Sequence, residues 1–550
     1  MAQSYLLPPL GYLNSRLRIV DKSQTQTPLS AVVAGAVGFF YNGPVGALVD
    51  VSDDITLETI FDTPTDTNYN DWFNVSRVFL YKANGLNGTV KVSRAVGDGS
   101  LNGALAVTDT VVVIEADLVT QRIDNADQAL APTVIFDTAV LDSSTAKLKF
   151  FSKYPTNIVY NIAMCKASDF STANIATGVS FADNFNTVPT GTEVAIAVMS
   201  STGTILEKWV VDLTPGNVDG EGNDNYIENV INLQSQYILC YQNGTATTPL
   251  SFESTSLKLG TVVTPLTADY ITALSYFEDT ASVDINYMIG NDEVIAEQIT
   301  LCEGRQDCSL RWGAPVSSVK GVSEATAVTN LVTYATTTVN VNTTYASFYG
   351  NAALIYDKYG KTQRWITLSG DIVGAQIMNN LQDVPWQAIA GLTRGQLKNI
   401  IKLAFNPKAN SMRTLQLNKI NPVISKVGQG NVIWGFDSYT TVNSKLKNAP
   451  TRELIIYVWR SNKPYLEAQI AEILDDITFN LVESKMIQFF EQLQSARGIY
   501  DFRVSIDKSA YAIDNNILGV AVAFTPVGYA KEVQFSLVIA STGSNLEELV

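Results

Sequence analysis

The sequence predicts a multidomain α+β protein, a mixed α/β fold with a small β-rich insertion and extended terminal arms. Its 550 residues are enough for about three to four domains of ordinary size. A hydrophobic share of 46% and a charged share of 16% are typical of a folded protein whose surface is partly covered by neutral side chains or by neighbouring molecules. Along the chain, segments with the period of a strand alternate with segments with the period of a helix.

Residues 1–27 are expected to form an extended arm. The prolines at positions 8, 9 and 28 discourage a helix, and the run Arg16–Val20 begins with the alternation of a strand. So short a segment has too few local partners to fold alone. It is therefore either disordered or adds as a strand to another sheet.

An α/β unit is expected next. Strands are predicted at 31–40, which is built of small apolar residues, and at 47–51, before an acidic helix start at Ser52-Asp53-Asp54. A helix is predicted over 68–83 and a strand over 89–95. The helix carries its apolar side chains close to one stripe: Trp72, Phe73, Val75, Val78, Phe79 and Leu80. This β-β-α-β order predicts one sheet that is mostly buried.

The middle of the chain is predicted to be less regular. Residues 97–145, rich in Val, Thr, Asp and Ala, indicate a small β insertion. Residues 327–344 are rich in Thr, Val and Asn, which suggests a loop with flanking strands. Between these segments the predicted elements are strands at 193–199, 206–213 and 237–241, and a helix at 223–233.

The last third has the most regular pattern. The predicted elements are helices at 393–406 and 408–420, a strand at 431–436, a helix or strand at 452–460, a helix at 480–496, and strands at 499–507, 517–524 and 533–540. The long helix places its apolar residues along one face: Leu481, Val482, Met486, Phe489, Phe490, Leu493 and Ala496. Gly498 stands where a C-cap glycine is expected.

The composition excludes several classes of function. The chain has no histidine, which removes the commonest general base, the commonest metal ligand and the serine or cysteine triads. A net charge of −16 argues against a nucleic-acid-binding surface. No signal peptide is visible, and the best membrane candidate, residues 31–41, is far shorter than the roughly 20 residues that a bilayer requires. A cytoplasm is therefore the default compartment.

No motif predicts a cofactor or a metal site. Gly360-Lys361-Thr362 lacks the first glycine of a phosphate-binding loop, and Gly97–Gly103 has the wrong spacing for a dinucleotide fingerprint. Asp219–Asp224 has the composition of a calcium loop without its spacing, which favours a solvated turn. Cys302 and Cys308 are expected to be buried thiols rather than metal ligands.

The stretch Ser347–Gly374 combines aromatic residues with glycines and contains no catalytic constellation. It resembles the core signature of contractile tail sheath proteins of tailed bacteriophages (myovirus type), in which an aromatic strand, Tyr-Asp-Lys-Tyr, a second strand and Asp-Ile-x-Gly follow one another. Its aromatic residues and glycines are expected to pack the core of the fold. Further blocks match this family in the same order: Gly38–Pro44, Phe61–Pro64, Phe79–Tyr81, Arg94, Asn225–Asn232, Gly304–Cys308, Arg394–Gln396, Ile420–Pro422, Gly435, Arg452, Gly498–Val504, Pro526 and Ser541–Gly543.

The match covers most of residues 30–95 and 190–550 and departs from the family at three places. Asp62 replaces a glycine of the family pattern, residues 97–145 do not match, and the Ser-Pro-Gly opening common in the family is absent.

The resemblance implies a structural subunit and not an enzyme. Such a subunit polymerises helically around a tail tube and contracts to drive the tube through the host envelope for genome ejection. The implied partners are further copies of the chain, the tail tube protein, and baseplate and tail terminator proteins at the ends, with no direct contact to nucleic acid and no membrane insertion. The subunit is expected in the virion after assembly in the host cytoplasm, with no catalytic, cofactor-binding or metal site.

The resemblance also suggests how the chain is divided. The expected parts are an N-terminal linking arm (1–27), a discontinuous middle domain (28–96 with 300–405), a small outer β insertion (97–145), an outer α/β domain (146–299), and a C-terminal inner domain with a linking arm (406–550). Residues expected to link subunits are Leu17, Ile19, Val20, Phe535, Leu537 and Ile539. Residues expected to face the tube lie on the polar side of the helix at 480–496 and just beyond it: Glu483, Lys485, Gln488, Glu491 and Arg497.

Two other functions stay open. The same residues would serve the sheath of a genome-free contractile injection particle (tailocin-like). The acidic pairs Asp53-Asp54, Asp475-Asp476 and Glu547-Glu548 leave room for a β-rich carbohydrate-active enzyme, which would need a cleft with two carboxylates about 5–9.5 Å apart.

Overall fold

The computed structural model describes residues 32–83, 85–86, 88–100, 102–107, 112–113, 148–243, 250–257 and 260–531. The predicted N-terminal arm and the predicted strand at 533–540 lie outside these residues, and so do Leu17, Ile19, Val20, Phe535, Leu537 and Ile539. Helices and several separate sheets confirm the predicted α+β, multidomain class. Within the described residues, no helix has both the length and the hydrophobicity that crossing a bilayer requires.

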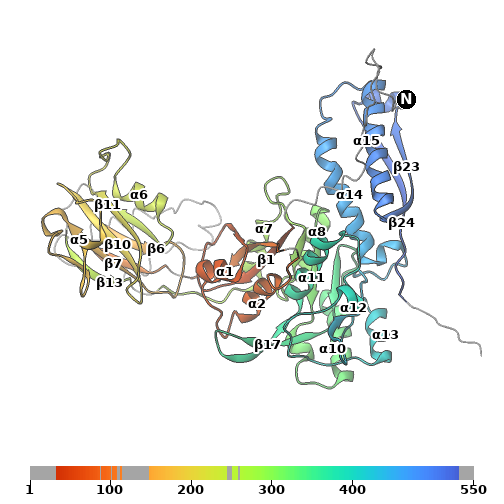
Figure 1. Cartoon of the computed structure of the whole chain (residues 1–550), viewed down its shortest axis with the longest axis horizontal. Coiled ribbons are helices and arrows are strands. Elements are labelled where there is room, and N and C mark those ends of the chain that lie inside the picture. Colours follow the sequence, from red (N-terminus) through yellow and green to blue (C-terminus); the bar gives the residue numbers. More distant parts are fainter. Residues whose placement is uncertain are drawn as a thin grey trace, which may run out of the picture.

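A seven-stranded sheet forms the centre of the protein (Figure 1). Its strands lie in the order β2 (Leu48–Val51), β3 (Thr89–Ala95), β1 (Val33–Phe39), β14 (Tyr287–Ile289), β15 (Ser309–Gly313), β16 (Ala346–Tyr349) and β20 (Ile420–Asn421). Every neighbouring pair is parallel except β2 with β3. Parallel strands are covered on both faces, which explains why β1 is apolar along its whole length.

Helices cover both faces of this central sheet. One core contains side chains of α1 (Asp54–Phe61), α2 (Tyr69–Val78) and α11 (Ser369–Gln382). The opposite core contains side chains of α7 (Thr267–Ser275), α8 (Ile295–Arg305), α9 (Val316–Val319), α10 (Glu324–Thr333) and α13 (Ala409–Leu417). The centre is therefore a three-layer sandwich.

The stretch Ser347–Gly374 runs through the middle of this sandwich. It contains most of β16, the hairpin of β17 (Ala352–Asp357) and β18 (Thr362–Thr367), and the first turns of α11. Its aromatic residues differ in burial: Tyr349 is 1% exposed, but Tyr356 is 58% exposed. The expectation of core packing is therefore confirmed for Tyr349 and wrong for Tyr356, which alternates to the outside of β17.

Two glycines in this stretch let α11 lie directly against α2. A Cβ atom on Gly370 would come within 2.0 Å of the Asn74 carbonyl oxygen, and one on Gly374 within 2.5 Å of the Tyr81 ring. Between them, Asp371 is completely buried and binds the guanidinium of Arg77 through both carboxylate oxygens at 2.7–3.0 Å. The Tyr81 hydroxyl donates to the same carboxylate at 2.8 Å.

A separate β-rich body extends from the central sheet, on the left of Figure 1. It has two four-stranded sheets. The strands of the first sheet lie in the order β11 (Ile205–Asp212), β10 (Glu193–Ser200), β7 (Tyr160–Lys166) and β13 (Phe252–Ser256). The strands of the second lie in the order β12 (Ile238–Gln242), β6 (Leu148–Ser152), β4 (Ala104–Val107) and β5 (Val112–Val113). Smaller elements are β8 (Asn174–Ala176), β9 (Val179–Ser180), α5 (Phe181–Asn184) and α6 (Ile227–Gln234). The described strands of the 97–145 insertion thus belong to this body.

The chain returns to the central sheet earlier than the predicted boundary at residue 300. α7 and β14 lie within the predicted range 146–299, yet β14 pairs with β1 and β15. With only three residues, β14 is too short to show a period in the sequence.

Two predicted segments have a different structure. A helix was predicted at 393–406, but only α12 (Gly391–Arg394) is helical there. The backbone beyond it bonds to neighbouring strands instead: the Ile401 N–H donates to the Leu354 carbonyl, and residues 402–403 form β19 (Lys402–Leu403), which pairs with β17. The loop predicted at 327–344 is wrong, since α10 continues into a π-helix at Tyr334–Val339. Its Thr and Val content suggested strands, but Ala327, Leu331 and Ala335 pack a helical face against the sheet.

Most other predicted elements of the last third are confirmed. The observed elements are α13, the hairpin of β21 (Val423–Lys426) and β22 (Gly430–Ile433), α14 (Ala449–Glu467), α15 (Asp476–Ser495), β23 (Ile499–Asp507), α16 (Ala510–Asp514) and β24 (Gly519–Pro526). α14 settles the undecided segment at 452–460 as a helix.

Candidate subunit-linking surface

The C-terminal unit consists of α14, α15 and the β23–β24 hairpin, at the upper right of Figure 1. Asp475 begins α15 as its N-cap and accepts the Ile477 and Thr478 N–H groups at 3.0 and 2.9 Å. The buried side of α15 follows the helical period: Phe479, Val482, Met486, Phe490 and Leu493. Leu481, which was predicted on this face, is 59% exposed instead.

The end of α15 differs from the expected glycine cap. Arg497 has the left-handed conformation (φ 62°), and Gly498 does not. The Gly498 N–H still closes the helix by donating to the Leu493 carbonyl at 2.9 Å. Its lack of a side chain serves packing, since a Cβ atom there would lie 3.0 Å from Leu493 and 3.2 Å from Trp386.

The hairpin has one apolar and one polar face. Phe502, Val504 and Ile506 of β23 lie opposite Phe524, Val522 and Val520 of β24, and these pairs pack on α15. The other face is exposed and carries short or polar side chains: Asp501, Arg503, Ser505, Asp507, Ala521, Ala523 and Thr525.

Both outer edges of this hairpin are open in the described part of the chain. β23 and β24, of nine and eight residues, pair only with each other there. Edge strands carry rows of unpaired N–H and C=O groups that can bind another strand. A two-stranded ribbon is also only marginally stable by itself, and added strands would complete it. The geometry therefore suits strand addition from another chain.

The segment that follows β24 is held by Trp386, which packs in the core of the C-terminal unit, and by Phe436 and Asp437, which follow β22. The Tyr529 hydroxyl donates to the Trp386 carbonyl at 2.6 Å, and its ring packs edge-on against Phe436 with centroids 5.9 Å apart. Lys531 forms an ion pair with Asp437 and lies over the Phe436 ring. Burial raises the pKa of Tyr529 to about 12, so its hydroxyl stays a donor at neutral pH. We call these contacts the exit clamp.

Charged side chains join α14 to the central sheet. Glu453 of α14 is 3% exposed and binds both Arg311 of β15, as a buried ion pair, and the Ser309 hydroxyl at 2.6 Å. Farther along α14, Arg460 donates to the carbonyls of Ile285 at 2.7 Å and Asp307 at 3.1 Å. The C-terminal unit is thus attached to the central body through buried polar contacts.

The residues predicted to face a tube lie along one side of α15 and at its end. Lys485, Gln488, Glu491 and Arg497 are exposed, and Glu483 is half-buried. They are available for contact with another protein, and which protein they face stays a prediction.

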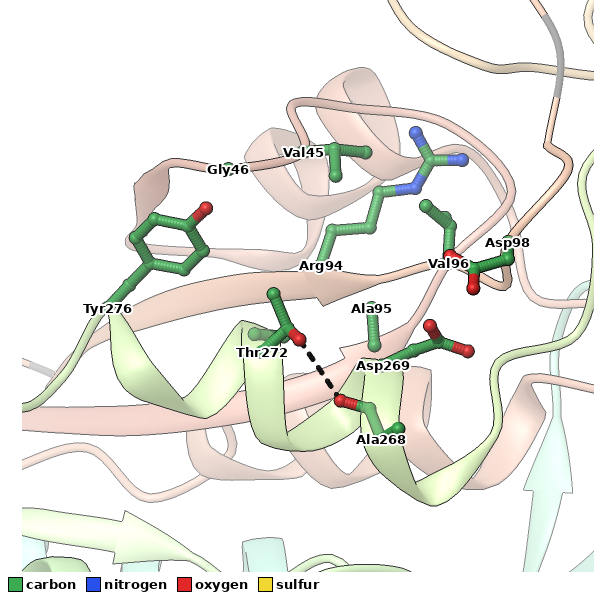
Figure 2. A pocket seen from close by; sticks show the side chains of 11 residues that line it. Val45, Gly46, Arg94, Ala95, Val96, Asp98, Ala268, Asp269, Thr272 and Tyr276 are labelled. Carbon is green, nitrogen blue, oxygen red and sulfur yellow. Dashed lines mark hydrogen bonds between the residues drawn. The ribbon is translucent and has the colours of Figure 1, made fainter. Parts of the chain in front are cut away.

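A cavity of about 200 Å³ lies beside β3 (Figure 2). Arg94, from β3, is buried and donates to the carbonyls of Phe40, Gly43 and Pro155 at 2.9, 2.6 and 2.8 Å. Burial lowers its pKa to about 9. The Asp269 carboxylate accepts the Leu266 N–H at 2.8 Å at the start of α7. Arg94 and Asp269 therefore have structural partners, and Arg94 ties the β-rich body to the central one through Pro155.

A half-buried acidic pair, Asp71 and Asp292, lies where α2 meets the end of β1. Asp71 accepts the Phe39 N–H at 2.8 Å and the Tyr270 hydroxyl at 3.3 Å. Burial raises the pKa of Asp71 to about 6, and burial followed by the charge of Asp71 raises that of Asp292 to about 7. Oδ1 of Asp292 accepts no hydrogen bond from the described residues.

The remaining candidate motifs have plain structures. Cys302 and Cys308 are buried, as expected, with sulfur atoms 3.6 Å apart. The Asp219 carboxylate accepts the N–H groups of Glu221 and Asn223 at 2.9 Å, so Asp219–Asp224 forms the predicted turn.

Two features of the structure are not predicted by any pattern in the sequence. The Arg77–Asp371 pair joins residues 294 positions apart, and only the buried Asp in Asp-Ile-x-Gly hinted at a partner. The second is a cluster of exposed apolar side chains on the C-terminal unit, whose exposure the sequence pattern does not reveal: Ile470, Ile473, Ile477, Leu481, Ile513 and Ile517.

Comparisons with known proteins confirm the resemblance to contractile tail sheath proteins. The chain is 25% identical over 399 residues to the tail sheath protein of Vibrio phage KVP40, covering 68% of this chain and 59% of that protein. It is 27% identical over 301 residues to the tail sheath protein of Enterobacteria phage T4, covering 51% and 46%. The chain thus spans about half the length of these curated relatives. No protein-family model matches it.

Solved structures show the same fold. The sheath tail protein of Listeria innocua aligns over 90% of this chain and 95% of its own with a TM-score of 0.55 at 9% identity. The sheath tail protein of Desulfitobacterium hafniense aligns over 93% and 100% with a TM-score of 0.51, also at 9% identity.

Proposed function

We propose that this chain is the structural subunit of a contractile tail sheath. Many copies form a helical sleeve around a tail tube, and the sleeve contracts to drive the tube through the host envelope for genome ejection. A head-to-tail contact that does not close on itself gives an open helix, so one pair of surfaces can build a long sleeve. The similarity to tail sheath proteins and the open hairpin support this proposal.

The open hairpin is the observation that carries the proposal. Strands Leu17–Val20 and Val533–Ala540 of neighbouring copies would add to the edges of β23 and β24. Backbone hydrogen bonds would then tether the subunits, and alternate side chains would fix the register. Such tethers keep their bonds while the subunits rotate between an extended, kinetically trapped sleeve and a contracted one.

The proposed partners are those that the similarity to tail sheath proteins implies. They are further copies of the chain, the tail tube protein along the sleeve, and the baseplate and tail terminator proteins at its ends. The subunit would assemble in the host cytoplasm and reside in the virion, with no enzymatic role. The same surfaces would serve a genome-free contractile particle, and only the particle itself separates the two.

Deleting residues 1–20 tests the linking arm. The shortened chain should stay folded, because the described fold contains none of these residues. Electron microscopy should show striated sleeves or tubes with the full chain and dispersed monomers with the shortened one. Tubes from the shortened chain would refute the arm, and a full chain that stays monomeric and cleaves carbohydrate would refute the sheath.

A further inference from the structure

The tip of the C-terminal unit carries an open apolar groove of about 900 Å³. It lies between the end of α14 and the beginning of β24, and its lining includes Leu466, Ile470, Ile473, Ile513, Leu518 and Val520. Ile470 and Ile473 are 75% and 76% exposed. Exposed apolar side chains gathered in this way mark binding surfaces, and the volume is in the range of occupied protein pockets.

The groove adjoins the start of β24, one of the two strands of the open hairpin. Leu518 and Val520 line the groove and also pack on the inner face of the hairpin. A strand added to β24 in parallel orientation would have its preceding residues at this end of the hairpin. The occupant of the groove would then be the segment before the added strand.

Charge separates the two segments that could provide this occupant. Glu472 lines the groove, no lysine or arginine is among its lining residues, and Asp475 and Asp514, which follow the lining residues Leu474 and Ile513, are exposed. Residues 1–31 have three basic residues against one acidic residue, a net charge of +2, whereas residues 532–550 have three acidic residues and no basic one. The acidic rim favours the N-terminal segment and repels the C-terminal one.

The residues before Arg16–Val20 also have the composition that an apolar groove binds. Tyr5–Leu13 has the sequence Tyr-Leu-Leu-Pro-Pro-Leu-Gly-Tyr-Leu and contains no charge. Prolines limit the backbone to extended conformations, which lowers the entropy lost on docking. Four leucines in nine residues supply the apolar contact.

We infer that the groove binds residues 5–13 of a second copy of this chain. The inference rests on the proposed function and adds to it a side-chain anchor that precedes the added strand. The groove and Leu6, Leu7 and Leu10 would form the apolar contact, while the hairpin edge binds the backbone of Arg16–Val20.

Crosslinking between two full-length variants tests this contact. Leu7→Cys in one chain and Asn516→Cys, which lines the groove, in another can react only between molecules. The four native cysteines are buried and should not compete. A bismaleimide should give a crosslinked dimer from this mixture but not when Leu233→Cys, on the 83% exposed Leu233 of α6, replaces Asn516→Cys.

Adding Ile473→Glu to the Asn516→Cys chain should lower the crosslinking rate about tenfold or more, the factor that corresponds to 1.4 kcal/mol. Ile55→Glu, at an isoleucine that is 77% exposed on α1, is the matched control and should leave the rate unchanged. Circular dichroism verifies that each variant is folded.

The outcomes separate this inference from the proposed function. Sleeves with the crosslink support both. Sleeves without it, or a crosslink from Leu537→Cys in place of Leu7→Cys, overturn the groove assignment alone. A crosslink without sleeves keeps the groove contact and overturns the sheath, and the absence of both overturns both.

Discussion

Arg77 and Asp371 form a completely internal ion pair between α2 and α11, with nitrogen–oxygen distances of 2.7–3.0 Å. Asp371 belongs to the stretch Ser347–Gly374, and Arg77 lies 294 positions earlier in the chain. Arg77 also donates to the backbone carbonyls of Lys398 and Asn399, so one guanidinium fixes two helices and the irregular segment after α12.

Removing one member of this pair should strongly destabilise the fold. Asp371→Asn leaves Arg77 charged and buried, and we expect the free energy of unfolding to fall by about 3–5 kcal/mol. Denaturant unfolding measures the change. Asp383→Asn is the control, because Asp383 pairs with Arg394 at a site 36–37% exposed and should cost at most about 1 kcal/mol. Equal losses in the two variants would contradict the structural importance of the buried pair.

The contact of α11 with α2 should not tolerate a methyl group. We expect Gly370→Ala to lower the free energy of unfolding by about 1–3 kcal/mol, because its Cβ would lie 2.0 Å from the Asn74 carbonyl oxygen and the helices must separate. Gly304→Ala in α8 is the matched control. No atom lies within 4 Å of its added Cβ, so this change should be neutral or stabilise by up to about 1 kcal/mol.

The half-buried pair Asp71 and Asp292 should make stability depend on pH. The folded pKa values of Asp71 and Asp292, about 6 and about 7, lie above the unfolded value near 3.9. The folded state therefore binds more protons between about pH 4 and pH 7, and the contribution of these groups to stability is lost as pH rises through that window. Unfolding measured at a series of pH values should show this decline. The double variant Asp71→Asn with Asp292→Asn should flatten it, and an unchanged slope would exclude these residues as its source.

Charge reversal on α15 should separate tube binding from self-assembly. We expect Lys485→Glu with Arg497→Glu to impair sleeve formation on purified tubes and to spare tube-free polymers. Both side chains are exposed, so the fold should be unaffected. Electron microscopy with and without tubes gives the readout, and unchanged assembly on tubes would count against the proposed placement of α15.

Local patterns were sufficient to predict elements whose own residues carry a clear period. The β3 strand and the β23 strand were predicted to the residue, since alternation and flanking turns mark them. Segments 393–406 and 327–344 were not, because β17, β22 and the central sheet determine their structure from far along the chain. β14 escaped detection because three residues carry no period.

The candidate surface was predictable only in part. The hairpin strands and the exposed side of α15 follow from the sequence, whereas the apolar groove brings together residues 466–474 and 513–520 in space. The exit clamp likewise joins Tyr529 to Trp386, 143 positions earlier. Such contacts arise from tertiary structure, and no short pattern indicates them.

The exit clamp determines how the subunit would bear a mechanical load. A neighbour pulling on the chain beyond residue 531 would act first on Tyr529 and Lys531, whose partners Trp386, Phe436 and Asp437 all lie outside the hairpin. The force would pass to these partners without peeling β24 from β23, where hydrogen bonds break one after another. A linking strand that lies along β23 or β24 would be pulled along its own axis, and this direction loads many hydrogen bonds at once. The linkage would thus be strong in tension along the sleeve, while the thin hairpin is protected from tearing.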